Sequence, residues 1–504
     1  MLIKRAFFGL AAAIGIAAAS FAAGVLWPLE RLEPVRTRGP LAITGVTVVD
    51  VRAGTLLPDR TVLVEDARIR AVGSDVAVPR GARVVDGRGK YLMPALWDMH
   101  AHVYAISPML DLPLYIAYGV TNVRDMQGCP GAGDPFVACP EDKRRWTAEA
   151  VTGKRVGPRI VASTSWMANG PGMVARLKNV PAYFDTATPD DARRFVRHFA
   201  GSVEAIKVYD GIPRDAYLAL VDEARRAGLE VVGHRPRAVS AIEAAAHQKS
   251  IEHARFILQE SYPGSAELRT RRTAPSHRDR QRMLDEHDGA MAQEIFAAMR
   301  ARGTWYVPTH LTRWSDAYAD APAVREDPLL RFVHPLLQRQ WAEDLDELLA
   351  EDPSAEARET YRRFHRKGLE LTGQAHRAGV RILAGTDYLV AGADFHRELE
   401  QLAAAGLPPA AVLRAATLAP AEYFGLEATH GTVDAGKVAD LVLLRANPLA
   451  AVHNTQTIEA VVFDGNFYDR AALDRITRHV ERQARSWAVG CRIVWRFLKN
   501  PANY

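Results

Sequence analysis

Six side chains that could bind a metal ion or transfer a proton lie between residues 100 and 387, each within a short, largely apolar stretch. They are His100 and His102 in LWDMHAH, Lys207 in AIKVYDG, His234 in LEVVGHR, His253 in SIEHARF and Asp387 in VRILAGTD. Neutral imidazoles and carboxylates are common ligands of zinc and related divalent ions. A bound divalent ion can activate water, so these residues suggest metal-assisted hydrolysis.

Each of these residues alone has an ordinary structural explanation. The chain contains 16 histidines, so a His-x-His pair arises easily by chance. In a strand, however, residues two apart project to the same side, so His100 and His102 could hold one ion together. Lys207 follows two apolar residues, a poor environment for a bare ammonium. Its carbamate, formed with CO₂, would be an anion able to bridge two cations, and it is the ordered set that predicts a metal site.

The segment 94–429 must position these groups, and it alternates strand-like with helix-like patterns. Eight short apolar runs predict strands, at 96–102, 119–126, 159–166, 205–211, 229–235, 250–256, 304–310 and 380–387. Helical patterns separate most of them, as in PRDAYLALVDEARRAG, where Pro213 suits an early helical position and Gly228 a stop. This order predicts an α/β fold, a (β/α)₈ TIM barrel whose functional groups lie at the carboxyl ends of its strands. A doubly wound open sheet is the alternative, but no glycine-rich phosphate loop follows the first strand.

The segments on either side of the barrel region have a different sequence pattern. Residues 39–93 and 430–470 contain short β-branched runs with turns between them, such as RTVLVEDARIRAVG and IEAVVFDGNFYD. Either flank alone would lack a core, so we expect one small composite β-sandwich built from both, rather than two separate β appendages. Residues 471–504 are expected to form a C-terminal helical extension.

The first 38 residues predict export. Lys4 and Arg5 precede an uncharged stretch over residues 6–27, the order typical of a secretory signal, and Ala22 and Ala23 would suit a signal peptidase. The same stretch is long enough to span a bilayer, with Trp27 at the interface. A cleaved signal peptide and a retained membrane anchor both stay open, and both predict a periplasmic or other extracytoplasmic location.

The cysteines fit that compartment. Cys129 and Cys139 flank the loop-like segment PGAGDPFVA, where a disulfide would be tolerated outside the cytosol. We favour that disulfide over free thiols and over a two-cysteine metal site, which lacks nearby partners; Cys491 would stay unpaired. The net charge of +5 and 24% charged residues are ordinary for a globular protein, so no nucleic-acid partner is expected. A homo-oligomer stays open.

Taken together, the motifs resemble the amidohydrolase superfamily, in its imidazolonepropionase-like and prolidase-like branch. The matching text is MPALWDMHAH, AIKVYDG, VVGHRPRAVSAIEAAAHQKSIEHARF, RILAGTD and LRAATLAPAEYFGLEATHGTVDAGKVADLVLLRANPL. The resemblance implies two divalent ions, usually zinc. In it, His100 and His102 match the first-strand pair, Lys207 the carboxylated bridging lysine, His234 and His253 the second-ion pair, and Asp387 the last-strand aspartate.

The resemblance also implies the reaction, hydrolysis of an amide bond in a small molecule such as a dipeptide or an N-acyl amino acid. Asp387 would accept a proton from the activated water and pass it to the leaving amine. A substrate carboxylate would need a partner, and Tyr209, Arg235 and Arg237 are candidates. The family commonly has a small residue where Arg235 stands. A mononuclear deaminase or cyclic-amide hydrolase, and a non-catalytic membrane-tethered binding protein, are the alternatives.

Overall fold

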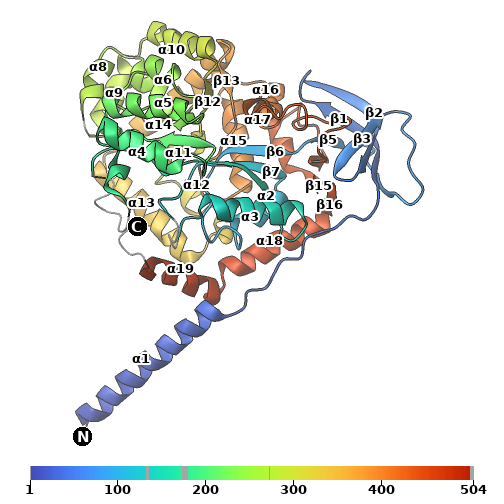
Figure 1. Ribbon diagram of the computed structural model, residues 1–504, viewed down its shortest axis with the longest axis horizontal. Helices are drawn as coiled ribbons and strands as arrows, with labels where there is room; N and C mark the ends of the chain where they lie inside the picture. Colours follow the sequence, from blue (N-terminus) through green and yellow to red (C-terminus); the bar gives the residue numbers. More distant parts are fainter. Residues whose placement is uncertain (1, 132–135, 173–179, 272, 500–504) are drawn as a thin grey trace.

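Eight short parallel strands form the centre of the molecule in a computed structural model, which describes residues 2–131, 136–172, 180–271 and 273–499 (Figure 1). They are β6 (Leu96–Ala101), β7 (Val120–Asp125), β8 (Arg159–Ser163), β9 (Ala205–Val208), β10 (Glu230–Gly233), β11 (Ser250–Glu252), β12 (Trp305–Val307) and β13 (Arg381–Ile382). Each lies within one of the eight predicted segments.

These strands close into a ring. Strands β6 to β8 form one parallel sheet and β9 to β13 another. Parallel bridges from Thr164 to Ala205 and from Ala168 to Val208 join the sheets on one side. On the other side, the Asp387 amide donates to the His100 carbonyl at 2.8 Å. The predicted barrel is therefore confirmed, and the carboxyl ends of all eight strands meet at one rim.

Helices cover the outside of the barrel and extend its rim. Between the strands lie α2 (Asp111–Ala117), α3 (Pro140–Val151), α4 (Pro189–Phe199), α5 (Arg214–Arg226), α6 (Ala241–Ala245), α10 (Gly289–Arg302) and α14 (Ala355–Arg377). After the last strand come α15 (Ala393–Ala404), α16 (Pro409–Ala415) and α17 (Leu418–Phe424). Further helices follow β11 and β12, namely α7 (Arg255–Glu260), α8 (Ser265–Thr270), α9 (His277–Asp285), α11 (His310–Ala317), α12 (Pro322–Arg325) and α13 (Pro335–Glu351). In α5, Pro213 is the N-cap rather than a helical residue, and Gly228 follows the helix with φ +69°.

The two flanks combine in one sheet beside the barrel. Its path is β16-β15-β14-β5-β1-β2-β3, with β4 also paired to β1. The strands are β1 (Leu41–Asp50), β2 (Thr55–Glu65), β3 (Arg68–Gly73), β4 (Arg83–Asp86), β5 (Tyr91–Pro94), β14 (Leu441–Leu444), β15 (Ile458–Phe463) and β16 (Asn466–Asp469). Because β5 pairs antiparallel with β14, the two ends of the chain share one buried core, as the composite prediction requires.

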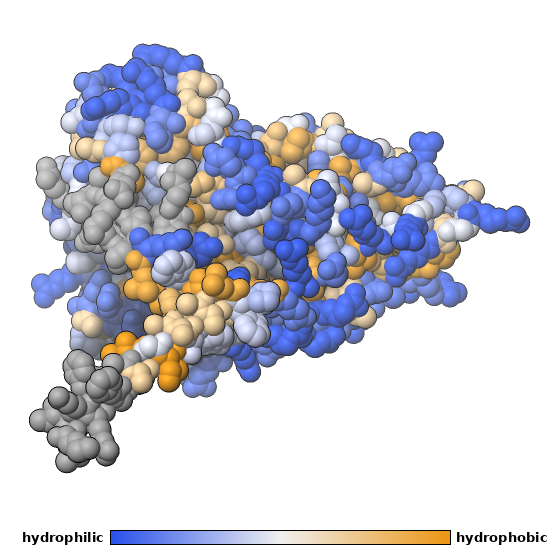
Figure 2. Space-filling view, turned by 60° about the horizontal axis from the view of Figure 1, so that its bottom comes forward, coloured by the Kyte–Doolittle hydropathy of each residue, from blue (hydrophilic) through white to orange (hydrophobic). Residues whose placement is uncertain are grey.

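Helix α1 (Leu2–Leu26) projects from the body, and its inner end packs against the C-terminal helix α19 (Trp487–Lys499), which follows α18 (Arg470–Ala484) (Figure 1). Arg492 donates to the carbonyls of Val25 and Trp27, at 3.1 and 2.7 Å. Apolar residues gather on the surface around the inner end of α1 (Figure 2). Within the described part of the chain, no helix combines the length and apolar character that a membrane crossing needs.

Candidate metal centre

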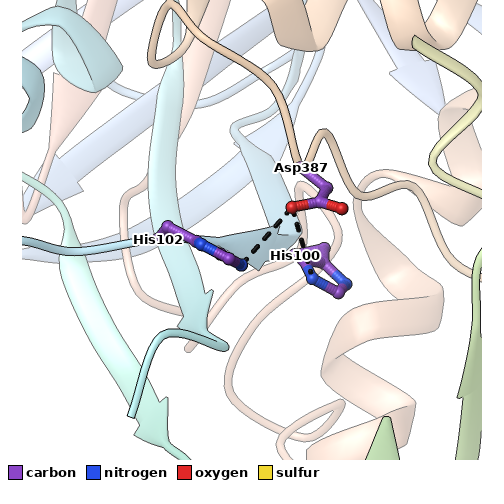
Figure 3. A group of neighbouring side chains, drawn as sticks. All are labelled: His100, His102 and Asp387. Atoms are coloured by element: carbon purple, nitrogen blue, oxygen red, sulfur yellow. Dashed lines mark ion pairs between the residues drawn. The ribbon is translucent and has the colours of Figure 1, made fainter. Parts of the chain in front are cut away.

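Three of the predicted ligands converge from the first and last barrel strands (Figure 3). His100 and His102 stand at the end of β6, and Asp387 follows β13. Asp387 Oδ1 lies 3.3 Å from His102 Nε2 and 3.6 Å from His100 Nε2. One ligand atom from each residue falls within 4.8 Å of the others, which is close enough to share one ion.

One member of the second histidine pair lies against the same carboxylate. His253, after β11, places Nδ1 3.5 Å from Asp387 Oδ2. The rings of His234 and His253 are 4.3 Å apart between centroids, and those of His100 and His253 are 5.1 Å apart. Asp387 therefore contacts both members of the first pair and His253 of the second, as a group that serves two ions would.

Lys207 lies buried on β9, beside the histidines. Its ammonium donates to the Met126 carbonyl. Burial lowers the pKa of Lys207, although the charge of Asp387 acts in the opposite direction. A lowered pKa favours the neutral amine, which is the form that reacts with CO₂. The carbamate itself stays a prediction.

Close packing beside Lys207 requires glycine at the end of β10. Gly233 has φ +119°, and a Cβ there would lie 2.3 Å from the Val208 carbonyl oxygen and 3.3 Å from Lys207 Cγ. A larger residue would force apart the strands that carry Lys207 and His234. This glycine thus permits the close approach of two predicted ligands.

Two of the predicted ligands at this rim have a strained backbone. His253 and Asp387 have φ of 71° and 47°, in the left-handed region that residues other than glycine seldom adopt. Hydrogen bonds hold both conformations, because the His253 amide donates to Val307 and the Asp387 amide to His100, each at 2.8 Å. Strain of this kind persists where surrounding structure enforces it, commonly at functional sites.

A buried carboxylate orients His100. Nδ1 of His100 donates to Glu252 at 3.0 Å, which leaves Nε2 facing Asp387. Glu252 in turn accepts from Arg124 at 2.8 and 2.9 Å. Burial alone would raise the pKa of Glu252, but Arg124 and His100 outweigh it, so the pKa is lowered and the group stays anionic. Such partners set the tautomer and orientation of metal-binding histidines.

A second buried carboxylate joins the strands that carry the first ligands. Asp98 accepts from the His100 amide at 3.0 Å, and from the amide and hydroxyl of Thr386 at 3.0 and 2.7 Å. Burial raises the pKa of Asp98 to about 6 despite these bonds. The contact fixes the end of β6 against the residue that precedes Asp387.

The nitrogen donors fit divalent ions. Burial lowers the pKa of His102, His234 and His253 well below 6.5, so all three are neutral near pH 7. Nε2 of His102, Nδ1 of His234 and Nε2 of His253 are buried, and none of them has a hydrogen-bond partner among the described residues. A buried polar atom without a partner is costly, and a bound cation would satisfy all three.

The three residues predicted to bind substrate differ in their surroundings. The Tyr209 ring lies 4.0 Å from that of His234, at the centre itself. Arg237 forms a 3.6 Å ion pair with Asp210 and lines the adjoining cavity. Arg235 also borders this cavity, but its guanidinium is buried, donating to the Val239 carbonyl at 2.8 Å and pairing with Glu260 at 3.2 Å. These contacts give Arg235 a structural role.

Sequence reasoning missed several residues of the site. Glu252 and Arg124 meet across 128 positions of sequence, so no local pattern could reveal them. Arg255 and Arg313 line the cavity beside His234. Arg255 had a visible signal, because it stands two residues after His253 in SIEHARF.

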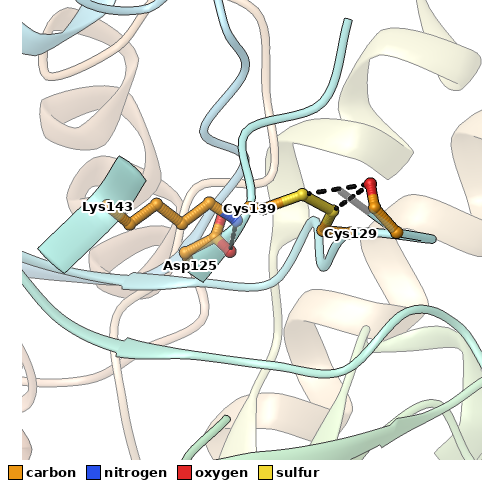
Figure 4. Close-up of a disulfide and its surroundings, with 5 residues drawn as sticks. Asp125, Cys129, Cys139 and Lys143 are labelled. Atoms are coloured by element: carbon orange, nitrogen blue, oxygen red, sulfur yellow. Dashed lines mark hydrogen bonds and ion pairs between the residues drawn. A yellow bond between two sulfur atoms is a disulfide. The ribbon is translucent and has the colours of Figure 1, made fainter. Parts of the chain in front are cut away.

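The predicted disulfide is linked to the segment after His102 through helix α3. Cys129 and Cys139 are bonded, and Cys491 is free and buried. Cys139 caps α3, whose Lys143 forms a buried ion pair with Asp125 at the end of β7 (Figure 4). Asp125 also accepts from the Val103 amide at 2.9 Å. The bridge therefore holds a helix whose lysine supports the segment directly after His102.

The model of the amidohydrolase family matches residues 91–467. The chain belongs to the amidohydrolase family. The matched span covers the whole barrel and the C-terminal strands of the composite sheet, and this amidohydrolase is accordingly a hydrolase acting on carbon–nitrogen bonds.

Solved structures of similar fold span most of this amidohydrolase. A bottromycin amidohydrolase is 27% identical, with a TM-score of 0.64 over 90% of this chain and 92% of its own. A Xaa-Pro dipeptidase is 16% identical, with a TM-score of 0.60 over 86% and 100%. Among curated proteins, adenine deaminase 2 of Agrobacterium fabrum is 29% identical over 39% of this chain, and the match spans about a third (32%) of that relative's length.

Proposed function

We propose that this amidohydrolase is a binuclear metal-dependent enzyme that hydrolyses the amide bond of a dipeptide or an N-acyl amino acid. The observation that carries the proposal is the position of Asp387, within 3.6 Å of His100, His102 and His253 at the carboxyl rim of the barrel. A carboxylate in contact with the first histidine pair and with one member of the second suits a site for two ions.

The predicted ligands divide between two ions, and zinc suits them because the donors are imidazoles and carboxylates. His100 and His102 would hold one, His234 and His253 the other, with carboxylated Lys207 and Asp387 between them. When bound, the ions would supply Lewis acidity and make water acidic enough to react near neutral pH. Asp387 would accept the water's proton and donate it to the departing amine.

A mononuclear deaminase or cyclic-amide hydrolase is the second candidate, favoured by the 29% identity to adenine deaminase 2. The buried Lys207 beside Asp387 supports the binuclear site instead, because one ion would leave that lysine without a function. A non-catalytic metal protein is less favoured, since structural zinc is usually closed by four protein ligands and six ligands are proposed here.

Asp387→Asn tests the proposed role directly. We expect the variant to keep its fold and lose turnover by about a hundredfold or more, because proton transfer by a positioned group contributes that much. The assay is a library of dipeptides and N-acyl amino acids, with metal content measured on the same preparation. A near-normal rate in a folded, metal-loaded variant would reject the role of Asp387.

We also propose that the protein acts outside the cytosol. The apolar N-terminal segment and the Cys129–Cys139 disulfide support this location, since structural disulfides persist in oxidising compartments. Cell fractionation should recover the protein outside the cytosol with its disulfide formed, and recovery in the cytosol as free thiols would contradict the proposal.

A further inference from the structure

Two cavities of different character reach the metal centre. One reaches it at His234 and is lined mainly by charged side chains. The other, of about 310 Å³, reaches it at His100, His102 and Asp387. A bound amide has two parts, the acyl group and the amine, and the bond between them must lie at the centre. Each cavity therefore suits one part.

The cavity at His234 has an excess of positive charge. Its charged lining beyond the buried, internally paired groups is Arg237, Arg255, Arg280, Arg313, Asp210 and Asp316. Four cations face two anions, which leaves two positive charges in excess. The paired groups do not change this balance, because Arg235 lies against Glu260, and Glu252 against Arg124.

The two excess positive charges can be assigned to particular arginines. Arg313 is paired with Asp316 at 2.6 Å, and Arg237 with Asp210 at 3.6 Å. Among the described residues, the carboxylate that pairs with Arg255 is the same Asp210, at 4.0 Å.

Arg280 lies with its guanidinium 4.6 Å from the centre of the Tyr361 ring, and no carboxylate within the described residues pairs with it. Arg255 and Arg280 are therefore the cations that an anionic ligand would satisfy, and Arg255, two residues after His253, is nearer in sequence to the centre.

The other cavity is aromatic. Tyr104, Tyr115, Trp341 and Tyr388 line it. Its two further carboxyl groups are occupied, because Asp98 accepts from Thr386 and Asp111 accepts from the Ser107 hydroxyl at 2.5 Å. This cavity suits an apolar or aromatic acyl group, whereas a second anion there would meet Asp98, Asp111 and Asp387.

We propose, on the basis of the proposed function, that the amine released is an acidic amino acid, glutamate or aspartate. The acyl part is then aromatic or apolar. Arg255, with Tyr209 nearby, binds the α-carboxylate, and Arg280 binds the side-chain carboxylate. Water adds across the amide: its oxygen bonds to the carbonyl carbon, the C–N bond breaks, and the nitrogen leaves with the water's proton. A basic leaving group would instead bring a third unpaired positive charge into a confined space.

Matched substrates test this specificity on the full-length, metal-loaded enzyme. Phe-Glu and Phe-Gln are nearly isosteric and differ by one charge, and Phe-Lys reverses that charge. We expect kcat/KM for Phe-Glu to exceed that for Phe-Gln by about tenfold or more, with Phe-Lys lowest. Equal rates, or a preference for Phe-Gln or Phe-Lys, would overturn the inference and leave the hydrolase proposal standing. Cleavage of none of the library would overturn both.

Substitutions then test which arginine binds which carboxylate of the substrate. Arg280→Met should reduce the Phe-Glu to Phe-Gln ratio to about one, and Arg280→Lys should restore part of it. Arg255→Met should lower kcat/KM for all three dipeptides, which share the α-carboxylate. Arg339→Met, at an arginine whose side chain is 79% exposed and pairs with Glu343, should keep both rate and ratio. Metal content reports intact folding, and an unchanged ratio in metal-loaded Arg280→Met would overturn the assignment of Arg280.

Discussion

At the scale of single residues, the centre depends on buried groups that hold the ligands. Glu252 is the clearest case, because it holds His100 and is held by Arg124 and Ser250, all within 3.0 Å. The sequence marks His100 by its pairing with His102, but Glu252 is an ordinary strand residue until the fold brings β7 and β11 near each other. Ligands at strand ends could be predicted, whereas the groups that orient them could not.

Glu252→Gln should weaken metal binding by about ten- to a hundredfold. The amide cannot neutralise Arg124, and it holds His100 in the required tautomer less firmly. Metal titration monitored by thermal unfolding would measure the change. Glu223→Gln is a matched control, since Glu223 is also buried and paired with Arg197, but lies on α5 away from the site. Equal metal affinity in Glu252→Gln and wild type would contradict the orienting role.

The histidine environments predict how metal binding depends on pH. Burial lowers the pKa of His102, His234 and His253 below 6.5, so protons compete with metal only at lower pH than for an ordinary imidazole. Metal should therefore be retained as pH falls through 6.5 and be released below it. Dialysis over pH 4.5 to 8 with metal analysis would follow this, and a release midpoint at or above 6.5 would contradict it.

At the scale of elements, the eight strands could be predicted because each is a short apolar run between helical patterns and turns. Their length could not, since β13 comprises only Arg381 and Ile382. The residues beyond it, up to Asp387, are held by irregular hydrogen bonds such as Asp387 to His100 rather than by a ladder. Periodicity does not report such contacts, because they depend on strands distant in sequence.

Gly233→Ala, at the end of β10, should lower the free energy of unfolding. A Cβ would lie 2.3 Å from the Val208 carbonyl oxygen, so the strand must shift, at about 2 to 4 kcal/mol, and the positions of His234 and Lys207 shift with it. Urea unfolding and metal content would report both effects. Gly228→Ala is the control: its φ is +69°, but nothing lies within 4 Å of the added carbon, so only about 1 kcal/mol of backbone strain is expected. Equal costs at the two positions would contradict the packing argument.

At the scale of the whole molecule, the flanking sheet is part of the same structural unit as the barrel. Strand β5 leads through Ala95 directly into β6, and Arg159 of β8 pairs with Asp440 and Asp464, which adjoin β14 and β15 of the sheet. The chain must therefore bring residues 41–94 and 441–469 together to complete the support of the first barrel strand. The similar β texture of both ends allowed this to be predicted, whereas the docking of α1 on α19 was not.

The central claim, a centre for two ions bridged through Lys207, is tested most directly by counting metal ions per folded chain. The wild-type protein, loaded with zinc and passed through a desalting column, should retain about two ions, as a site with four histidines, an aspartate and a carboxylated lysine allows. Lys207→Ala should retain one or fewer, because the bridging ligand is gone. One ion in the wild type, or two ions in Lys207→Ala, would contradict the claim.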